Sequence, residues 1–191
     1  RMDTAPRSQS SGYCRPINIL KAGGVGVLLT DTVYGLVGQA LNKKTVARIY
    51  HIKGRNNKKP FIILISSIED LRKFGIKIDG RINNILERFW PGPVSIILPC
   101  QLKKFEYLHR GTNTLAFRLP RKIMLLEILE RTGPLVAPSA NLENLPPAQN
   151  IREARNYFGD HIDFYLRGVR SRNKPSMIIK INAGNIKTIR K

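Results

Sequence analysis

From about residue 17 onward, short apolar runs alternate with segments whose apolar residues recur at helical spacing. This alternation is typical of an α/β domain, in which helices cover the faces of a central sheet. It therefore excludes most all-helical and all-β architectures. We predict strands at residues 25–29, 61–65, 94–98, 115–119, 135–137 and 177–181, and helices at residues 45–52, 67–74, 81–89, 123–131 and 151–158.

The size of the chain suits one domain. Its 191 residues are 42% apolar, which is enough to bury a full core. We predict a single domain over residues 17–191, preceded by a mobile Arg- and Ser-rich segment over residues 1–16. No apolar run approaches the roughly 18 residues of a membrane-spanning helix. We therefore expect no contact with a membrane. Cys14 and Cys100 form no disulfide framework, so we expect a reducing, cytoplasmic location.

The charge is strongly basic. Lys and Arg number 33 against 13 Asp and Glu, which gives a formal net charge of +20. Such a surface attracts polyanions through long-range Coulomb forces and counterion release. Nucleotides or RNA are the partners that this charge favours, although a basic surface can equally serve only to keep a small enzyme in solution.

Several common sites are not indicated by the sequence. The glycines at residues 23–26 precede a predicted strand, whereas a dinucleotide-binding loop follows one, so they indicate a turn. No P-loop sequence occurs. The three histidines lack metal-ligand spacing to one another and to the cysteines, so we predict no protein-held metal site and no Ser-His-Asp triad. These histidines are His51, His109 and His161.

Two polar clusters lie beside predicted strands, and folding could bring them together. The first contains Lys53 and Arg55, within a stretch from residue 32 to 68 that has no acidic residue. The second contains Ser139 and Asn141. Taken singly, the first is a solvated or RNA-facing loop or an anion site, and the second has the composition of an ordinary turn. Together, two cations, a hydroxyl and an amide form a set that handles phosphate.

Strand alternation also singles out one arginine. Over residues 115–119, Leu115, Phe117 and Leu119 share one face, so Arg118 points to the other. We expect Arg118 to leave the core toward solvent or a ligand.

Six short motifs occur in a fixed order along the chain. They are LTDTVYGL at 29–36, KGR at 53–55 with KP at 59–60, FWPGP at 89–93, RLP at 118–120, APSAN at 137–141 and PS at 175–176. In this order they resemble the YrdC/Sua5/TsaC family of threonylcarbamoyl-AMP synthases, over about residues 17–189. The length resembles the short form without the further C-terminal domain. The chain differs from the family pattern at three positions, which are Leu29, Glu143 and Met177.

The resemblance implies a fold and a reaction. The fold is a twisted, open, mostly mixed sheet with flanking helices and a large concave basic cavity. In the reaction, L-threonine, bicarbonate and ATP give threonylcarbamoyl-AMP and pyrophosphate, and Mg²⁺ bridges the phosphates. A separate tRNA threonylcarbamoyl transferase complex would use the product to modify the adenosine next to the anticodon. Direct tRNA contact through the basic surface is a further expectation.

The resemblance also implies residue roles. It makes Lys53 and Arg55 the catalytic residues. The residues that it implies for ATP and adenylate binding are Lys53, Arg55, Ser139, Asn141 and Ser176, and those for threonine are Thr30, Thr32, Tyr34 and Arg118. The alternative function is a non-catalytic RNA-binding module, favoured by the net charge and by a second acid-free stretch over residues 166–191.

Overall fold

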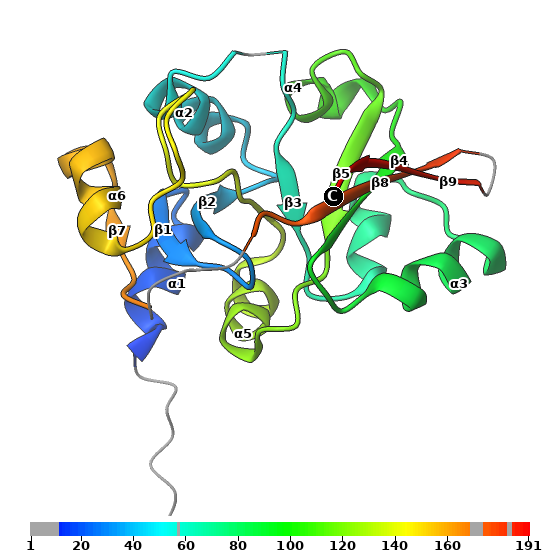
Figure 1. Ribbon diagram of the computed structural model, residues 1–191, viewed down its shortest axis with the longest axis horizontal. Helices are drawn as coiled ribbons and strands as arrows, with labels where there is room; N and C mark the ends of the chain where they lie inside the picture. Colours follow the sequence, from blue (N-terminus) through cyan, green and yellow to red (C-terminus); the bar gives the residue numbers. More distant parts are fainter. Residues whose placement is uncertain (1–11, 57, 169–173, 183–184) are drawn as a thin grey trace, which may run out of the picture.

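The computed structural model describes residues 12–56, 58–168, 174–182 and 185–191, which form one mixed β-sheet with helices on both faces (Figure 1). The strand order is β7-β1-β2-β6-β3-β5-β4-β8-β9. In chain order the elements are α1 (Cys14–Lys21), β1 (Gly26–Leu29), β2 (Tyr34–Gln39), α2 (Lys43–Lys53), β3 (Ile62–Leu64), η2 (Ile68–Phe74), α3 (Gly80–Phe89), β4 (Val94–Pro99), η3 (Lys103–Phe105), α4 (Glu106–His109), β5 (Thr114–Arg118), α5 (Ile123–Thr132), β6 (Leu135–Val136), α6 (Ile151–Phe158), η4 (Gly159–His161), β7 (Phe164–Tyr165), β8 (Met177–Asn182) and β9 (Asn185–Arg190).

The sheet combines parallel and antiparallel pairs, as predicted. β1 and β2 form an antiparallel hairpin in which Leu29 lies opposite Tyr34, so residues 30–33 form its turn. β3 is antiparallel to β6 and parallel to β5. β4 is antiparallel to β5 and parallel to β8, and β9 closes the far side of the sheet against β8. The predicted α/β class with a mixed sheet is confirmed.

Helices cover both faces of this sheet. α1 and α5 cover one face, where Leu20 and Leu129 pack in one buried cluster with Leu64 and Leu135 of the strands. The other buried cluster contains residues of α2, η2, α3, α4 and α6. In Figure 1, α5 lies below the strands, and α2 and α4 lie above them. The burial of these apolar faces fixes the positions of the helix and strand ends that carry the candidate site.

Helix α2 begins and ends at residues suited to capping. The side-chain oxygen of Asn42 accepts hydrogen bonds from two backbone N–H groups of the first turn, at 3.1 and 3.2 Å. Gly54 follows the helix with φ 59°, a left-handed conformation that glycine adopts without strain. The helix therefore ends at Lys53, and Arg55 begins the next loop.

Each predicted strand and helix is present, with ends shifted by a few residues. The predicted helix at 67–74 is a 3₁₀ helix, and Ser67 and Asp70 form a capping box at its start. The predictions missed the strands β2, β7 and β9 and the helices α1 and α4. In β2, two glycines weakened the strand pattern. Gly38 is required there because a Cβ atom at this position would lie 2.5 Å from the Thr45 methyl carbon of α2.

The N-terminal prediction is only partly within the described residues. α1 begins at Cys14, and Pro16 is buried, so residues 14–16 belong to a packed helix. Residues 1–11 lie outside the described residues, and the single domain over residues 17–191 stays a prediction. In the described parts of the chain, no helix is long and apolar enough to cross a membrane.

Candidate active site

The Lys53 side chain joins the two polar clusters that lie far apart in sequence. Its ammonium nitrogen donates to the carbonyl oxygens of Ser139 and Asn141, at 2.6 and 2.5 Å, and lies 3.3 Å from the side-chain oxygen of Asn141. An ammonium has three N–H donors, so these acceptors occupy all of them. Lys53 therefore holds the loop after β6 against the end of α2, and the two clusters meet as predicted.

The position of Lys53 changes its acid–base behaviour. The side chain is 1% exposed. Burial disfavours its charged form, and the nearby Arg55 adds like-charge repulsion, while Glu143 acts in the opposite direction. Together they lower the pKa of Lys53 to about 7.

The loop after β6 is also bonded within itself. The Ser139 hydroxyl donates to the side-chain oxygen of Asn141 at 2.6 Å. The Asn141 amide nitrogen donates to the carbonyl oxygens of Leu142 and Leu145, at 2.8 and 2.7 Å. The Asn141 side chain is therefore used inside the loop, where it fixes the position of Ser139.

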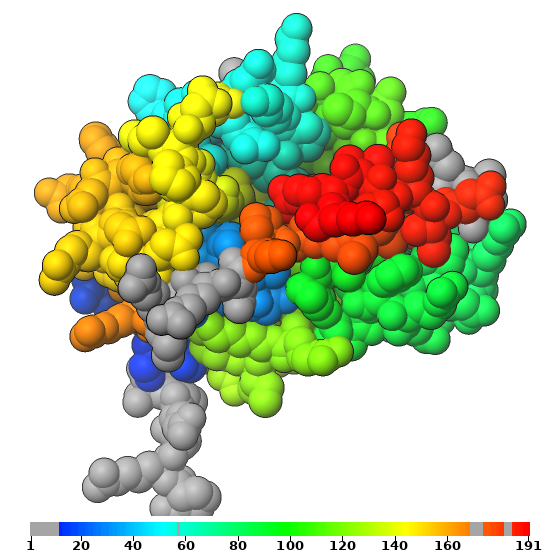
Figure 2. All heavy atoms as spheres, viewed as in Figure 1, coloured from blue at the N-terminus to red at the C-terminus, as the bar shows by residue number. Residues whose placement is uncertain are grey.

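A hollow of about 160 Å³ lies beside this loop. Three arginines and two serines line it, and none of its described lining residues is acidic. In Figure 2, the loop around residue 58 (cyan), the loop after β6 (yellow) and the C-terminal strand (red) border the same face of the molecule. The lining residues that carry charge or a hydroxyl are Arg55, Arg118, Ser139, Ser176 and Arg190.

The volume of the hollow limits what it can hold. Pockets for small-molecule ligands usually measure about 300–1,000 Å³, so 160 Å³ suits one end of a nucleotide. The larger cavity that the sequence predicted stays a prediction. Hollows of 510 and 690 Å³ lie elsewhere, and none of the predicted site residues lines them.

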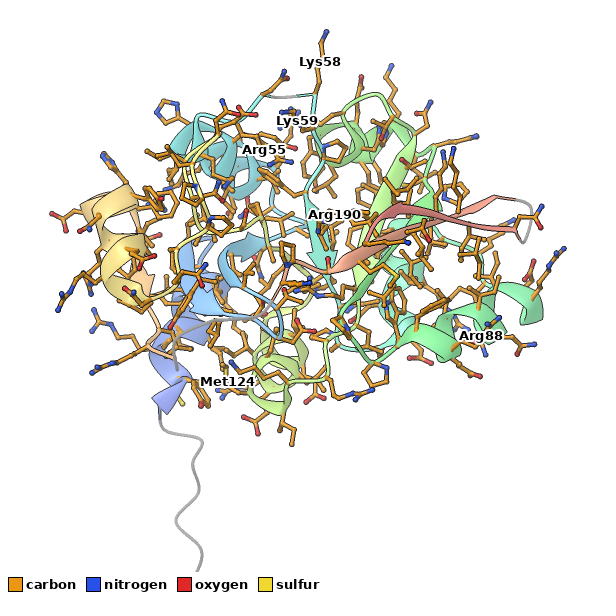
Figure 3. The ribbon with its side chains drawn as sticks, viewed as in Figure 1. Arg55, Lys58, Lys59, Arg88, Met124 and Arg190 are labelled. Atoms are coloured by element: carbon orange, nitrogen blue, oxygen red, sulfur yellow. The ribbon has the colours of Figure 1, made fainter. Side chains whose placement is uncertain are left out.

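Arg55 lies at one wall of the hollow. Its guanidinium carbon is 5.4 Å from the centroid of the Phe61 ring, and its Nε donates to the carbonyl oxygen of Lys59 at 3.4 Å. In Figure 3, Arg55 lies beside the end of α2 and Arg190 lies over the strands, whereas Lys58 projects away from the fold. The terminal nitrogens of Arg55 are therefore positioned to receive an anion.

Arg118 is buried, so the part of its prediction that allowed exit to solvent is wrong. Its Nη2 lies 3.0 Å from a carboxylate oxygen of Asp31 in the β1–β2 turn, and the two side chains are 4% and 9% exposed. This ion pair holds the guanidinium inside, where it lines the hollow. Burial lowers the pKa of Arg118, and the Asp31 carboxylate opposes that shift. The buried Nε of Arg118 has no hydrogen-bond partner among the described residues, so a donor remains for a ligand.

Arg190 of β9 is a site residue that sequence reasoning missed. Its Nε and Nη2 donate to the carbonyl oxygen of Ser176, at 3.1 and 2.8 Å. The Ser176 hydroxyl in turn shares a 2.8 Å hydrogen bond with the Ser95 hydroxyl. Arg190 thus fixes Ser176 and adds a cation to the hollow. The only signal in the sequence was the acid-free stretch to which it belongs.

Three residues predicted to bind threonine do not line this hollow. The hydroxyls of Thr30 and Thr32 lie 3.1 Å apart, and Thr30 also donates to the carbonyl oxygen of Val33 at 2.6 Å. The Tyr34 hydroxyl donates to the carbonyl oxygen of Gly168 at 3.0 Å. From this turn, Val33 contributes to the lining. The threonine-binding roles stay predictions.

No group of three His, Cys, Asp or Glu side chains with the geometry of a metal site occurs among the described residues.

The fold and the hollow together define an α/β protein with a cation-lined pocket suited to anionic ligands.

Comparison with known proteins agrees with this class. A family model described as telomere recombination, which groups the Sua5, YciO and YrdC proteins, matches residues 18–191. The threonylcarbamoyl-AMP synthase of Marinobacter nauticus is 34% identical over 85% of this chain and 87% of that protein. The chain belongs to the Sua5/YciO/YrdC family.

Solved structures show the same fold. The crystal structure of Pyrococcus abyssi Sua5 complexed with L-threonine matches with a TM-score of 0.85 and 29% identity. The match covers 92% of this chain and 52% of that one, so the chain spans about half the length of that protein. E. coli YciO has the same fold, with a TM-score of 0.81 at 21% identity, over 93% of this chain and 87% of that one. The predicted family, fold class and synthase function are confirmed at the level of the family.

Proposed function

We propose that this chain forms L-threonylcarbamoyl-AMP and pyrophosphate from L-threonine, bicarbonate and ATP at the cation-lined hollow. One observation carries the proposal: residues far apart in sequence bring three arginines and two serines to a hollow whose described lining has no carboxylate. The carbamate formed from threonine and bicarbonate is an anion, and so is ATP, so their approach is unfavourable in water. Fixed cations offset that repulsion.

The chemistry requires positioning and charge, and no covalent enzyme intermediate. The threonine amine and bicarbonate form a carbamate as an N–C bond forms, a C–O bond of bicarbonate breaks and water leaves. An oxygen of that carbamate then attacks the α-phosphorus of ATP. The bond from that phosphorus to the bridging oxygen breaks, and pyrophosphate leaves with the electron pair. Holding the reactants together can lower the barrier by up to roughly 7–11 kcal/mol, and cations around the phosphates stabilise the charge of the leaving group.

We assign the phosphates to Arg55 and Arg190, because a guanidinium matches phosphate oxygens in a fork. Ser139 and Ser176 would contact the nucleotide, with Asn141 supporting Ser139 from inside the loop. L-Threonine would lie on the Arg118 side, near the turn that contains Thr30, Thr32 and Tyr34. Lys53 would act by holding Ser139 and Asn141 in place, since its three donors are already used.

The lining also bears on Mg²⁺. No carboxylate occurs among the described lining residues, so the donor set fits a metal that arrives on the ATP phosphates and keeps water ligands. Bound in this way, the metal would offset charge on the departing pyrophosphate.

Pyrophosphate release tests the proposal. The protein should release pyrophosphate only when ATP, Mg²⁺, L-threonine and bicarbonate are all present, and Arg55→Ala should lose most of the activity. Absence of threonine-dependent release from the wild-type protein would overturn the proposed reaction. The product would pass to a separate tRNA threonylcarbamoyl transferase complex.

A second candidate, RNA binding, rests on another part of the surface. The 690 Å³ hollow is lined by Arg152, Arg155 and Arg167, with no acidic residue in its described lining. The Arg155 guanidinium lies 4.3 Å from the centroid of the Tyr165 ring. Exposed arginines of this kind suit the phosphates of a polynucleotide.

Salt titration of tRNA binding tests this second candidate. Replacing Arg152, Arg155 and Arg167 by Ala should weaken tRNA binding and reduce the salt dependence by about 0.9 in the log–log slope per lost phosphate contact. Unchanged binding in this variant would remove the arginine-lined hollow as an RNA surface.

A further inference from the structure

One carboxylate bridges the two loops that border the hollow. Glu143 follows β6, and its Oε2 accepts a hydrogen bond from the backbone N–H of Asn56 at 2.7 Å. Its Oε1 lies 3.0 Å from the ammonium nitrogen of Lys59. The backbone N–H of Glu143 donates to the carbonyl oxygen of Lys53 at 3.0 Å. Three bonds from one residue therefore fasten the loop after α2 to the loop after β6.

These bonds surround Arg55. Asn56 is the next residue along the chain, and the carbonyl oxygen of Lys59 accepts from the Arg55 Nε at 3.4 Å. That same oxygen also accepts from the Tyr50 hydroxyl at 2.9 Å. Glu143 thus fixes the backbone on one side of Arg55 and a contact residue on the other.

We infer that Glu143 is a positioning residue, which holds the loop after α2 so that the Arg55 guanidinium faces the hollow. The kinetic part of this inference rests on the proposed function. Its structural part concerns the loop alone.

Electrostatics explains why a carboxylate is useful here. Lys53, Arg55, Lys58 and Lys59 follow one another closely, and like charges at these distances repel. Within the described residues, Glu143 is the only carboxylate that forms an ion pair with a cation of this stretch. The hydrogen bonds from Lys59 and Asn56 hold the pKa of Glu143 below its ordinary value, so the group is charged at neutral pH.

Two substitutions separate the effects of Glu143. Glu143→Gln keeps an oxygen that can accept from the Asn56 N–H but loses the charge. Glu143→Ala loses both. If Glu143 acts through position, Glu143→Gln should retain most of the loop protection and ATP affinity that Glu143→Ala loses. If its negative charge instead weakens ATP binding by repulsion, both variants should bind ATP more tightly than the wild-type protein, which would overturn the inference.

Amide hydrogen exchange tests the structural part without any substrate. Glu143→Ala should speed exchange in the peptide that contains Arg55 and Asn56, by about tenfold or more, because the Asn56 N–H loses its acceptor. Exchange in α5 should not change. The control Glu130→Ala removes an exposed carboxylate from α5 and should leave exchange in the peptide that contains Arg55 and Asn56 unchanged. Equal exchange in Glu143→Ala and wild type would overturn the inference.

Steady-state kinetics tests the functional part. Glu143→Ala should raise KM for ATP by about tenfold, with a smaller change in kcat, whereas Glu143→Gln should stay within about threefold of wild type. Lys59→Met should reproduce part of the effect. Lys58→Met, its neighbour that projects away from the fold (Figure 3), should have none. Equal losses in the Gln and Ala variants would show that charge, and not position, accounts for the effect.

The two hypotheses fail in different ways. If the wild-type protein releases no threonine-dependent pyrophosphate, the proposed reaction is wrong, and the exchange experiment still decides the role of Glu143. If activity is present but Glu143→Ala matches wild type in exchange and in KM, the reaction stands and the positioning role does not.

Discussion

The ammonium nitrogen of Lys53 lies 2.6 Å from the carbonyl oxygen of Ser139, a residue 86 positions further along the chain. This contact ties the end of α2 to the loop after β6, which lines the hollow through Ser139. A buried cation that donates to carbonyl oxygens acts as an internal crosslink, so its first effect is on the geometry of the loop.

Lys53→Met should lower both stability and activity. The substitution leaves the carbonyl oxygen of Asn141 without its donor, which should cost about 1–3 kcal/mol of unfolding free energy. The carbonyl oxygen of Ser139 loses one donor and keeps the backbone N–H of Asn141, at 3.0 Å. Urea unfolding measures this cost, and pyrophosphate release measures kcat/KM. A Met variant with wild-type stability would contradict the crosslink.

The lowered pKa of Lys53 should make the free energy of unfolding depend on pH. Its pKa is about 7 in the folded protein, below its ordinary value, so the unfolded chain binds more protons above pH 7. This group therefore contributes an unfavourable term below pH 7, and the term disappears as pH rises from about 7 toward 10. Compared with Lys53→Met, the wild-type protein should gain stability over that window in urea titrations. A constant difference between the two proteins would refute the shift.

Arg55→Ala should affect ATP more than threonine. Loss of a guanidinium fork to phosphate should raise KM for ATP by about tenfold or more, equivalent to at least roughly 1.4 kcal/mol. Arg55→Lys should recover only part, because an ammonium cannot form two parallel hydrogen bonds. Circular dichroism checks the fold, and Lys58→Ala is the matched control. Equal increases in KM for both substrates would argue against a phosphate contact.

Arg118 and Asp31 should be coupled. Arg118→Met removes a buried charge partner of Asp31, which can cost up to about 3–5 kcal/mol. The double variant Arg118→Met with Asp31→Asn should be more stable than the sum of the single changes predicts. A double-mutant cycle by urea unfolding gives the coupling, and additive effects would show that the ion pair is unimportant.

The sequence predicted those parts of the fold that depend on local pattern. The apolar runs located most strands, and the two polar clusters beside them meet where Lys53 contacts Ser139. The missed strand β2 is one that needs Gly38 for contact with α2, a requirement that appears only when the helix is in place. Likewise, strand alternation gave the face of Arg118 but not its pairing with Asp31, because the partner comes from another turn.

The position of Arg190 in β9, the last strand in chain order among the described residues, has a consequence for folding during synthesis. During synthesis, the β1–β2 hairpin, the end of α2 and the loop after β6 leave the ribosome first, while the guanidinium that holds Ser176 emerges after them. A nascent chain cut short of residue 190 would therefore expose an unfinished binding surface. Competence to hold its ligand should therefore arise only after β9 has been synthesised.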